Sequence, residues 1–138
     1  MSDRPSPAIT ELTAPFWRGG AAGELRIQRC GACRRWVHPP QPMCPSCHGR
    51  EMRAEAVSGR GAVWSYTVNR YRWAPGIEPP YVLAEVELDE QPGLRLLTAI
   101  VDVDPDGDPP QVSIGLPVRV CFERAGDAWI PLFGPELR

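Results

Sequence analysis

The chain has 138 residues, enough for one domain or for two small modules that share an interface. No window approaches the roughly 18 uninterrupted apolar residues of a membrane span, and the first residues lack the apolar core of an export signal. We therefore expect a cytoplasmic protein in a reducing setting, with no membrane partner. A net charge of −2 argues against a general nucleic-acid binder. All 15 basic residues are Arg, which excludes a catalytic or Schiff-base lysine.

The charge is unevenly distributed along the chain. Between residues 24 and 72, nine Arg stand against three Glu, whereas from Glu78 onward four Arg stand against twelve acidic residues. Such an asymmetry is consistent with ordinary solvated surface. It is equally consistent with a basic face for phosphate groups or for an acidic partner.

The first segments in chain order are a tail and a helix. Residues 1–11 are polar and rich in Pro, so we expect a disordered tail. Residues 12–24 have helical spacing, with Thr10 or Thr13 as a cap and Pro15 in the first turn. Glycines at 19, 20 and 23 predict either one weak helix or two short pieces.

Two large aromatic side chains lie on this helical segment. Phe16 and Trp17 are too large to remain in water in a stable monomer. They either pack on the following module or wait for a partner, and they are our candidate partner interface.

Four cysteines dominate residues 25–54. They form two Cys-x-x-Cys pairs separated by ten residues: Cys30, Cys33, Cys44 and Cys47. The alternative is two disulfides, but paired Cys-x-x-Cys loops without an export signal favour a metal. Zinc is favoured over iron because it is the commoner structural occupant of a four-thiolate site. Such a site has no open position, so the zinc is expected to be structural, and His38 and His48 are not needed as ligands.

Short strands flank these cysteines. Residues 25–29 lead into the first pair and residues 36–38 lead away from it, until Pro39-Pro40 stops the pairing. The pattern predicts a zinc ribbon of two hairpins whose core is the metal. A module this small depends on metal binding for much of its folding free energy.

Residues 55–138 have a different periodicity. Alternating and β-branched runs predict five strands at 63–70, 81–88, 94–103, 118–124 and 129–133, with Gly- and Pro-rich turns between them. The connections leave no room for crossover helices, so we expect a small closed β-barrel. Cys121 lies in the fourth run, where we expect a small buried side chain.

Patterns typical of catalysis are not found. The acidic loop at 104–108 lacks the Gly and the Glu of a calcium loop. No phosphate-binding glycine motif and no nucleophile with a neighbouring base stands out. We expect that the chain does no chemistry alone.

Several motifs together resemble a known family. They are Pro15-Phe16-Trp17, the segment from Gly23 to Cys30, Pro39-Pro40, Cys44-Pro-Ser-Cys47, the segment from Gly61 to Thr67, Pro80-Tyr81-Val82 and the segment from Gly115 to Val118. In this order they are similar to the bacterial and archaeal zinc-ribbon OB-fold family of acyl-CoA-associated proteins, over residues 12–135. The resemblance implies a mainly β protein with a short N-terminal helix or helices, a rubredoxin-like zinc ribbon and a five-stranded OB-fold barrel.

The same resemblance implies a function. Such chains are non-catalytic partners of thiolase-fold enzymes: thiolases, archaeal hydroxymethylglutaryl-CoA-forming assemblies, polyketide-type acyltransferases and lipid-transfer-protein-like aldolases that shorten steroid side chains. The chain would support an acyl-CoA site, and a dimeric thiolase-fold core favours two copies of each chain. This sequence departs from the family pattern at Arg34 and His48, where Gly is usual, and at Gln41, where Arg is usual.

A candidate contact to CoA follows the first barrel strand. Arg70 and Arg72 offer guanidinium groups for phosphates, and the aromatic rings of Tyr71, Trp73 and Tyr81 offer stacking surfaces for adenine. The alternative is an ordinary strand end with exposed Arg.

Two other functions are weighed against the accessory subunit. Barrels of this size also bind single-stranded nucleic acid with stacked aromatics, although the acidic second half opposes this. An iron ion at the four thiolates would instead make an electron carrier.

Overall fold

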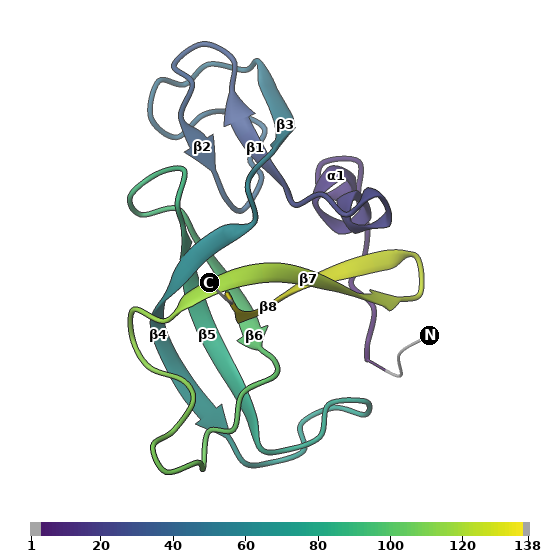
Figure 1. The fold of residues 1–138 in the computed structure, drawn as a ribbon. Helices are drawn as coiled ribbons and strands as arrows, with labels where there is room; N and C mark the ends of the chain where they lie inside the picture. Colours follow the sequence, from purple (N-terminus) through teal and green to yellow (C-terminus); the bar gives the residue numbers. More distant parts are fainter. Residues whose placement is uncertain (1–3, 137–138) are drawn as a thin grey trace.

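The computed structural model describes residues 4–136. They form a helical segment, a three-stranded sheet and a closed barrel (Figure 1). Helix α1 (Ala14–Arg18) passes directly into the 3-10 helix η1 (Gly19–Ala22), so the division of the predicted helix into two short pieces is confirmed. Thr13 stands at the N-cap position of α1, but its hydroxyl makes no capping bond and instead accepts from the Thr10 N–H at 3.0 Å.

The predicted disordered tail falls partly outside the described residues, which begin at residue 4. Within the described part, Arg4 Nε donates to Glu123 Oε2 on the barrel at 2.7 Å. This contact attaches the start of the described chain to the barrel.

The ribbon sheet has three strands in the order β2-β1-β3. These are β1 (Arg26–Cys30), β2 (Trp36–Val37) and β3 (Met52–Ala56), all antiparallel to their neighbours. The sequence predicted the hairpin of β1 and β2 but not β3. The residues of β3 are good helix formers, and pairing with β1 overrides that propensity.

The barrel contains the five predicted strands. They are β4 (Arg60–Asn69), β5 (Tyr81–Leu88), β6 (Arg95–Ile100), β7 (Pro117–Ala125) and β8 (Ala128–Pro135). The barrel order is β4-β5-β6-β8-β7, with β7 also pairing with β4 and β8 running parallel to β6. The mainly β architecture and the closed barrel are thereby confirmed.

One hydrophobic core connects the ribbon to the barrel. Leu25, Ile27 and Trp36 of the ribbon belong to the same buried cluster as Val63 and Phe133 of the barrel. The boundary suggested between residues 54 and 55 lies inside β3. The two modules therefore share buried apolar surface, which is the main source of folding stability.

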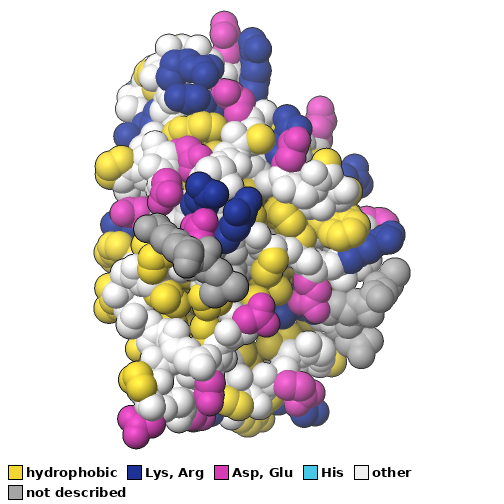
Figure 2. Space-filling model, viewed as in Figure 1, with side chains coloured by type: hydrophobic (Ala, Val, Ile, Leu, Met, Phe, Trp, Pro, Cys, Tyr) yellow, Lys and Arg dark blue, Asp and Glu magenta, His cyan; other side chains and the backbone are white. Residues whose placement is uncertain are grey.

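Basic side chains are frequent at the ribbon end of the molecule. Figure 2 shows Arg side chains gathered over the ribbon, which is the upper part of the view in Figure 1.

Within residues 4–136, no helix has the length and apolar character needed to cross a membrane.

Candidate metal centre and partner-facing surfaces

The two Cys-x-x-Cys segments fold into nearly identical turns. The Arg34 N–H donates to the Cys30 carbonyl oxygen and the His48 N–H donates to the Cys44 carbonyl oxygen, both at 3.0 Å. Arg34 and His48 have φ values of 66° and 63°, in the left-handed region. Glycine adopts this region without strain, which gives a physical reason for the Gly that the resemblance led us to expect at these positions. Larger residues occupy both positions in this chain.

The turns bring the four predicted ligands together. The sulfurs of Cys30, Cys33, Cys44 and Cys47 lie within 4.8 Å of one another. Two of the separations are 3.6 Å (Cys30–Cys47) and 3.7 Å (Cys33–Cys44). Zn–S bonds of about 2.3 Å in a tetrahedron require sulfurs about 3.8 Å apart. The donor set and its spacing therefore fit zinc.

Backbone amides surround the sulfurs. The N–H groups of Cys33, Ser46 and Gly49 lie 3.5, 3.4 and 3.3 Å from the sulfurs of Cys30, Cys44 and Cys47, respectively. Such contacts favour the thiolate that a metal requires. Cys30 and Cys44 are buried while Cys33 and Cys47 are exposed, so the site opens to the surface on one side.

The electrostatics of the sulfurs favour a cation. The Cys33 N–H lowers the pKa of the Cys30 thiol to about 6. At Cys47 the Gly49 N–H lowers the pKa, but the nearby sulfur of Cys30, burial and the other two sulfurs outweigh it and raise the pKa to about 11. Four thiolates so close together repel one another, and a divalent metal ion removes this repulsion by replacing the protons.

The fifth cysteine is not buried, contrary to our expectation. Cys121 is exposed on β7. Val118 and Val120 point from the same strand towards the core, so the alternation of the strand turns Cys121 outward. Its thiol pKa is raised by partial burial and by Asp102 and Glu123.

Four of the candidate CoA residues, Arg70 to Trp73, lie on the loop between β4 and β5, and Tyr81 is the first residue of β5. The rings of Tyr71 and Trp73 pack 4.7 Å apart, and Asn69 connects Trp73 to Tyr81 through hydrogen bonds of 2.9 Å each. The structure thus brings the three aromatic residues together. Tyr71 and Trp73 are 64% and 71% exposed, which leaves their rings available for stacking.

The two Arg of this loop already have acidic partners. Arg70 donates to both carboxylate oxygens of Asp106 at 2.7 and 3.1 Å, which raises the pKa of the guanidinium and lowers that of Asp106. Arg72 donates to Glu78. A phosphate would have to displace these carboxylates.

Phe16 and Trp17 lie between the ribbon and the barrel. The Phe16 ring packs 4.8 Å from Trp17 and 4.9 Å from His38, and both aromatic side chains are half-buried. Together with His38 and Leu97 they line a mainly apolar groove of about 440 Å³. Leu97 is 76% exposed, and the sequence does not distinguish it from the other residues of a β-strand.

Gln91 is a further residue that sequence reasoning missed. From the turn between β5 and β6, its side chain accepts from the Trp36 N–H at 2.9 Å and donates to the Trp36 carbonyl at 3.1 Å. This pair of bonds fixes β2 against the barrel. No local sequence signal indicates such a contact, because its partners are 55 residues apart.

Two family descriptions cover most of the chain. "ChsH2, rubredoxin-like zinc ribbon domain" matches residues 17–53, and "ChsH2, C-terminal OB-fold domain" matches residues 54–123. The barrel is therefore an OB-fold and the cysteine module a rubredoxin-like zinc ribbon, as the resemblance implied.

The chain is also similar to named proteins of known source. A probable enoyl-CoA hydratase alpha subunit of Thermomonospora curvata is 38% identical over 135 residues, covering 97% of this chain and 40% of the relative. The benzoylsuccinyl-CoA thiolase subunit BbsA of Thauera aromatica is 34% identical over 71 residues, covering 51% of this chain and 49% of the relative. The chain thus spans less than half the length of these two relatives.

A solved structure resembles the chain over nearly its full length. It is described as "Ltp2-ChsH2(DUF35) aldolase", with a TM-score of 0.82, 37% identity, and coverage of 94% of this chain and 98% of that chain. The chain therefore belongs to the ChsH2 family of proteins that combine a zinc ribbon with an OB-fold.

Proposed function

We propose that this chain is a non-catalytic accessory subunit that binds a thiolase-fold enzyme and helps to form its acyl-CoA site. The observation that carries the proposal is the likeness of the whole fold to a chain from an aldolase assembly, at a TM-score of 0.82. The similarity to a thiolase subunit supports the same class of partner. A lipid-transfer-protein-like steroid side-chain aldolase and a thiolase are the two partners we consider.

The zinc is proposed to be structural. Four protein sulfurs fill a tetrahedral site, so none of its positions remains for water or substrate. Chemistry is therefore assigned to the enzyme partner. A reducing cytoplasmic setting suits four free thiols as metal ligands.

Acyl-CoA contact is proposed at the β4–β5 loop. The exposed rings of Tyr71 and Trp73, with Tyr81 beside them, would stack on adenine. Arg70 and Arg72 would then exchange Asp106 and Glu78 for the phosphates of CoA. Because this exchange disrupts two ion pairs, we expect binding in the complex and little binding to the isolated chain.

Affinity purification tests the partner. The tagged chain is expressed in its source organism, purified, and its companions are identified by mass spectrometry, with the half-buried Phe16 and Trp17 replaced by Ala in a parallel sample. We expect a thiolase-fold enzyme in roughly equimolar amount with the native chain and less of it with the variant. Recovery of a lone chain would contradict the proposal.

A single-stranded nucleic-acid binder is the second candidate. The exposed rings of Tyr71 and Trp73 beside two Arg favour it, since such a platform stacks on bases. A labelled oligonucleotide titrated at low salt decides between the two: tight, salt-sensitive binding would support this candidate, and no binding would remove it.

A further inference from the structure

Strand β3 forms the outer edge of the ribbon sheet. At its two ends, the Val57 N–H donates to the Leu25 carbonyl at 2.9 Å and the Gly31 N–H donates to the Glu51 carbonyl at 2.7 Å. Hydrogen bonding alternates along an antiparallel pair, so residues 53 and 55 also bond to β1. The N–H and C=O groups of residues 52, 54 and 56 consequently point away from the sheet.

One side chain partly covers this edge. Arg26 Nη2 donates to the Ala54 carbonyl oxygen at 3.3 Å and Nη1 contacts Glu24 at 3.4 Å, both long for charged hydrogen bonds. The Nε of Arg26 is buried without a hydrogen-bond partner. Because the hydrogen bonds of Arg26 are long, a ligand that offers better acceptors can displace its side chain from this edge.

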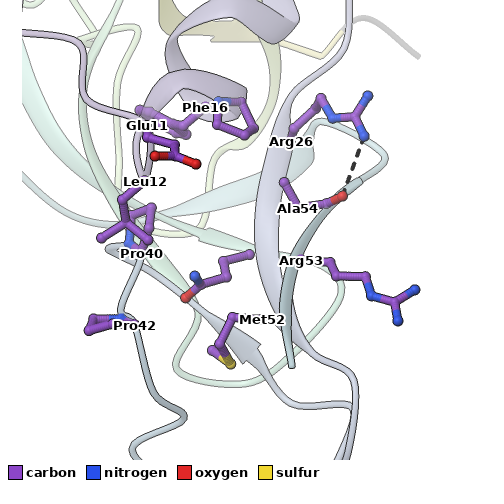
Figure 3. Close-up of a pocket in the computed structure, with 11 residues that line it drawn as sticks. Glu11, Leu12, Phe16, Arg26, Pro40, Pro42, Met52, Arg53 and Ala54 are labelled. Carbon is purple, nitrogen blue, oxygen red and sulfur yellow. Dashed lines mark hydrogen bonds between the residues drawn. The ribbon is translucent and has the colours of Figure 1, made fainter. Parts of the chain in front are cut away.

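Open space runs along the same edge. Ala54 lines three adjoining hollows of about 450, 270 and 410 Å³. Figure 3 shows the first of them, with Leu12, Phe16 and Met52 on its apolar walls and the guanidinium groups of Arg26 and Arg53 beyond the strands at the other side. An extended chain with side chains of moderate size therefore has room beside β3.

The charge along the edge favours an acidic occupant. Glu55 is already paired with Arg29 and Arg34, at 3.8 and 3.4 Å. Arg53 is exposed and forms no ion pair with any residue in the described range 4–136. Acidic residues also line these hollows: Glu11 lies on the helix side of the first, and Glu51 lines the one of about 270 Å³ together with Arg53.

We propose that an extended segment of the enzyme partner adds to β3 as a fourth strand of the ribbon sheet. Its backbone pairs with the outward groups of residues 52, 54 and 56. Apolar side chains on one face enter the hollow beside Leu12 and Met52, and a carboxylate on the other face lies opposite Arg53. This inference rests on the proposed function, because the segment belongs to that partner.

Substitution of Ala54 by Pro tests strand addition. The Ala54 N–H points outward, so Pro removes a donor that the added strand needs without removing a bond to β1. The full chain and its co-purified enzyme are separated and recombined, and the Kd is measured for native chain, Ala54→Pro and Ala54→Ser. We expect Ala54→Pro to weaken binding at least about tenfold and Ala54→Ser to leave it unchanged. Zinc content and melting temperature identify a misfolded variant.

Hydrogen exchange provides a readout that does not depend on a variant. The amides of residues 52, 54 and 56 should exchange quickly in the free chain and become protected in the complex. Arg53→Glu should weaken binding about fivefold, whereas the matched reversal Arg119→Glu, on the exposed outer face of β7, should not.

The outcomes separate this inference from the proposed function. Absence of binding by the native chain overturns both. Strand addition alone is overturned if a well-folded Ala54→Pro variant binds with native affinity, or if the amides of residues 52, 54 and 56 gain no protection in the complex. Protection of the same amides in a concentrated sample of the chain by itself assigns the edge to a second copy and also overturns it.

Discussion

The hypothesis of a zinc site depends on individual cysteines of the ribbon. Cys44 is a buried sulfur of the cluster, and Cys121 is an exposed thiol on the barrel, so the two form a matched pair of substitutions. We predict that Cys44→Ser lowers the zinc content from about one ion per chain to none and unfolds the ribbon, because metal binding supplies its folding free energy. Cys121→Ser should retain zinc. Elemental analysis and circular dichroism measure both, and zinc loss from both variants would contradict the assignment.

The imidazole of His38 is expected to make the stability of the chain depend on pH. Burial lowers the pKa of its imidazole to about 4. Between about pH 6.5 and 4 the unfolded chain therefore binds a proton that the folded chain excludes, so stability falls as pH falls. The expected loss between pH 7 and pH 5 is about 2 kcal/mol. Denaturant unfolding of native chain and His38→Leu at pH 7 and 5 measures this difference while zinc content is monitored. The substitution His48→Gln, at an exposed position, is the control. If the unfolding free energy of His38→Leu changes between pH 7 and 5 by as much as that of the native chain, the prediction is refuted.

At the scale of elements, the helical segment depends on a close approach. A Cβ on Gly20 would lie 2.5 Å from Trp129 Cβ and 2.6 Å from the Phe122 ring, so glycine is required where η1 packs on β7 and β8. We predict that Gly20→Ala destabilises the chain by about 1–3 kcal/mol through overpacking. Ala21→Ser, at the exposed neighbouring position, should cost less than about 0.5 kcal/mol. Urea unfolding compares the two, and equal midpoints would exclude this account.

Sequence patterns predicted some elements better than others. β5 spans Tyr81–Leu88, the same residues that alternation predicted, because one face of this strand is buried and the other is not. Strand β3 was not predicted because its residues are good helix formers. Its strand conformation comes from pairing with β1 across the cysteine turns. The metal ligands followed from local spacing, whereas the Gln91 contact and the groove beside Leu97 arise from tertiary packing that local patterns do not contain.

At the scale of the whole molecule, the orientation of the ribbon on the barrel decides which surfaces a partner meets. Gln91 makes two hydrogen bonds to the Trp36 backbone, and removing its side chain leaves both backbone groups without these partners. We predict that Gln91→Ala destabilises the chain by about 1–2 kcal/mol and speeds hydrogen exchange in β2. Asp89→Ala, at an exposed position two residues away, should change neither quantity. Unchanged exchange in β2 of Gln91→Ala would show that the shared core alone sets the orientation.

Native mass spectrometry of the complex purified from its source organism tests the central claim most directly. The account predicts an assembly containing two copies of this chain, one zinc ion in each, and two copies of a thiolase-fold enzyme. A chain that carries no zinc, or that appears alone under conditions that preserve non-covalent complexes, would contradict it.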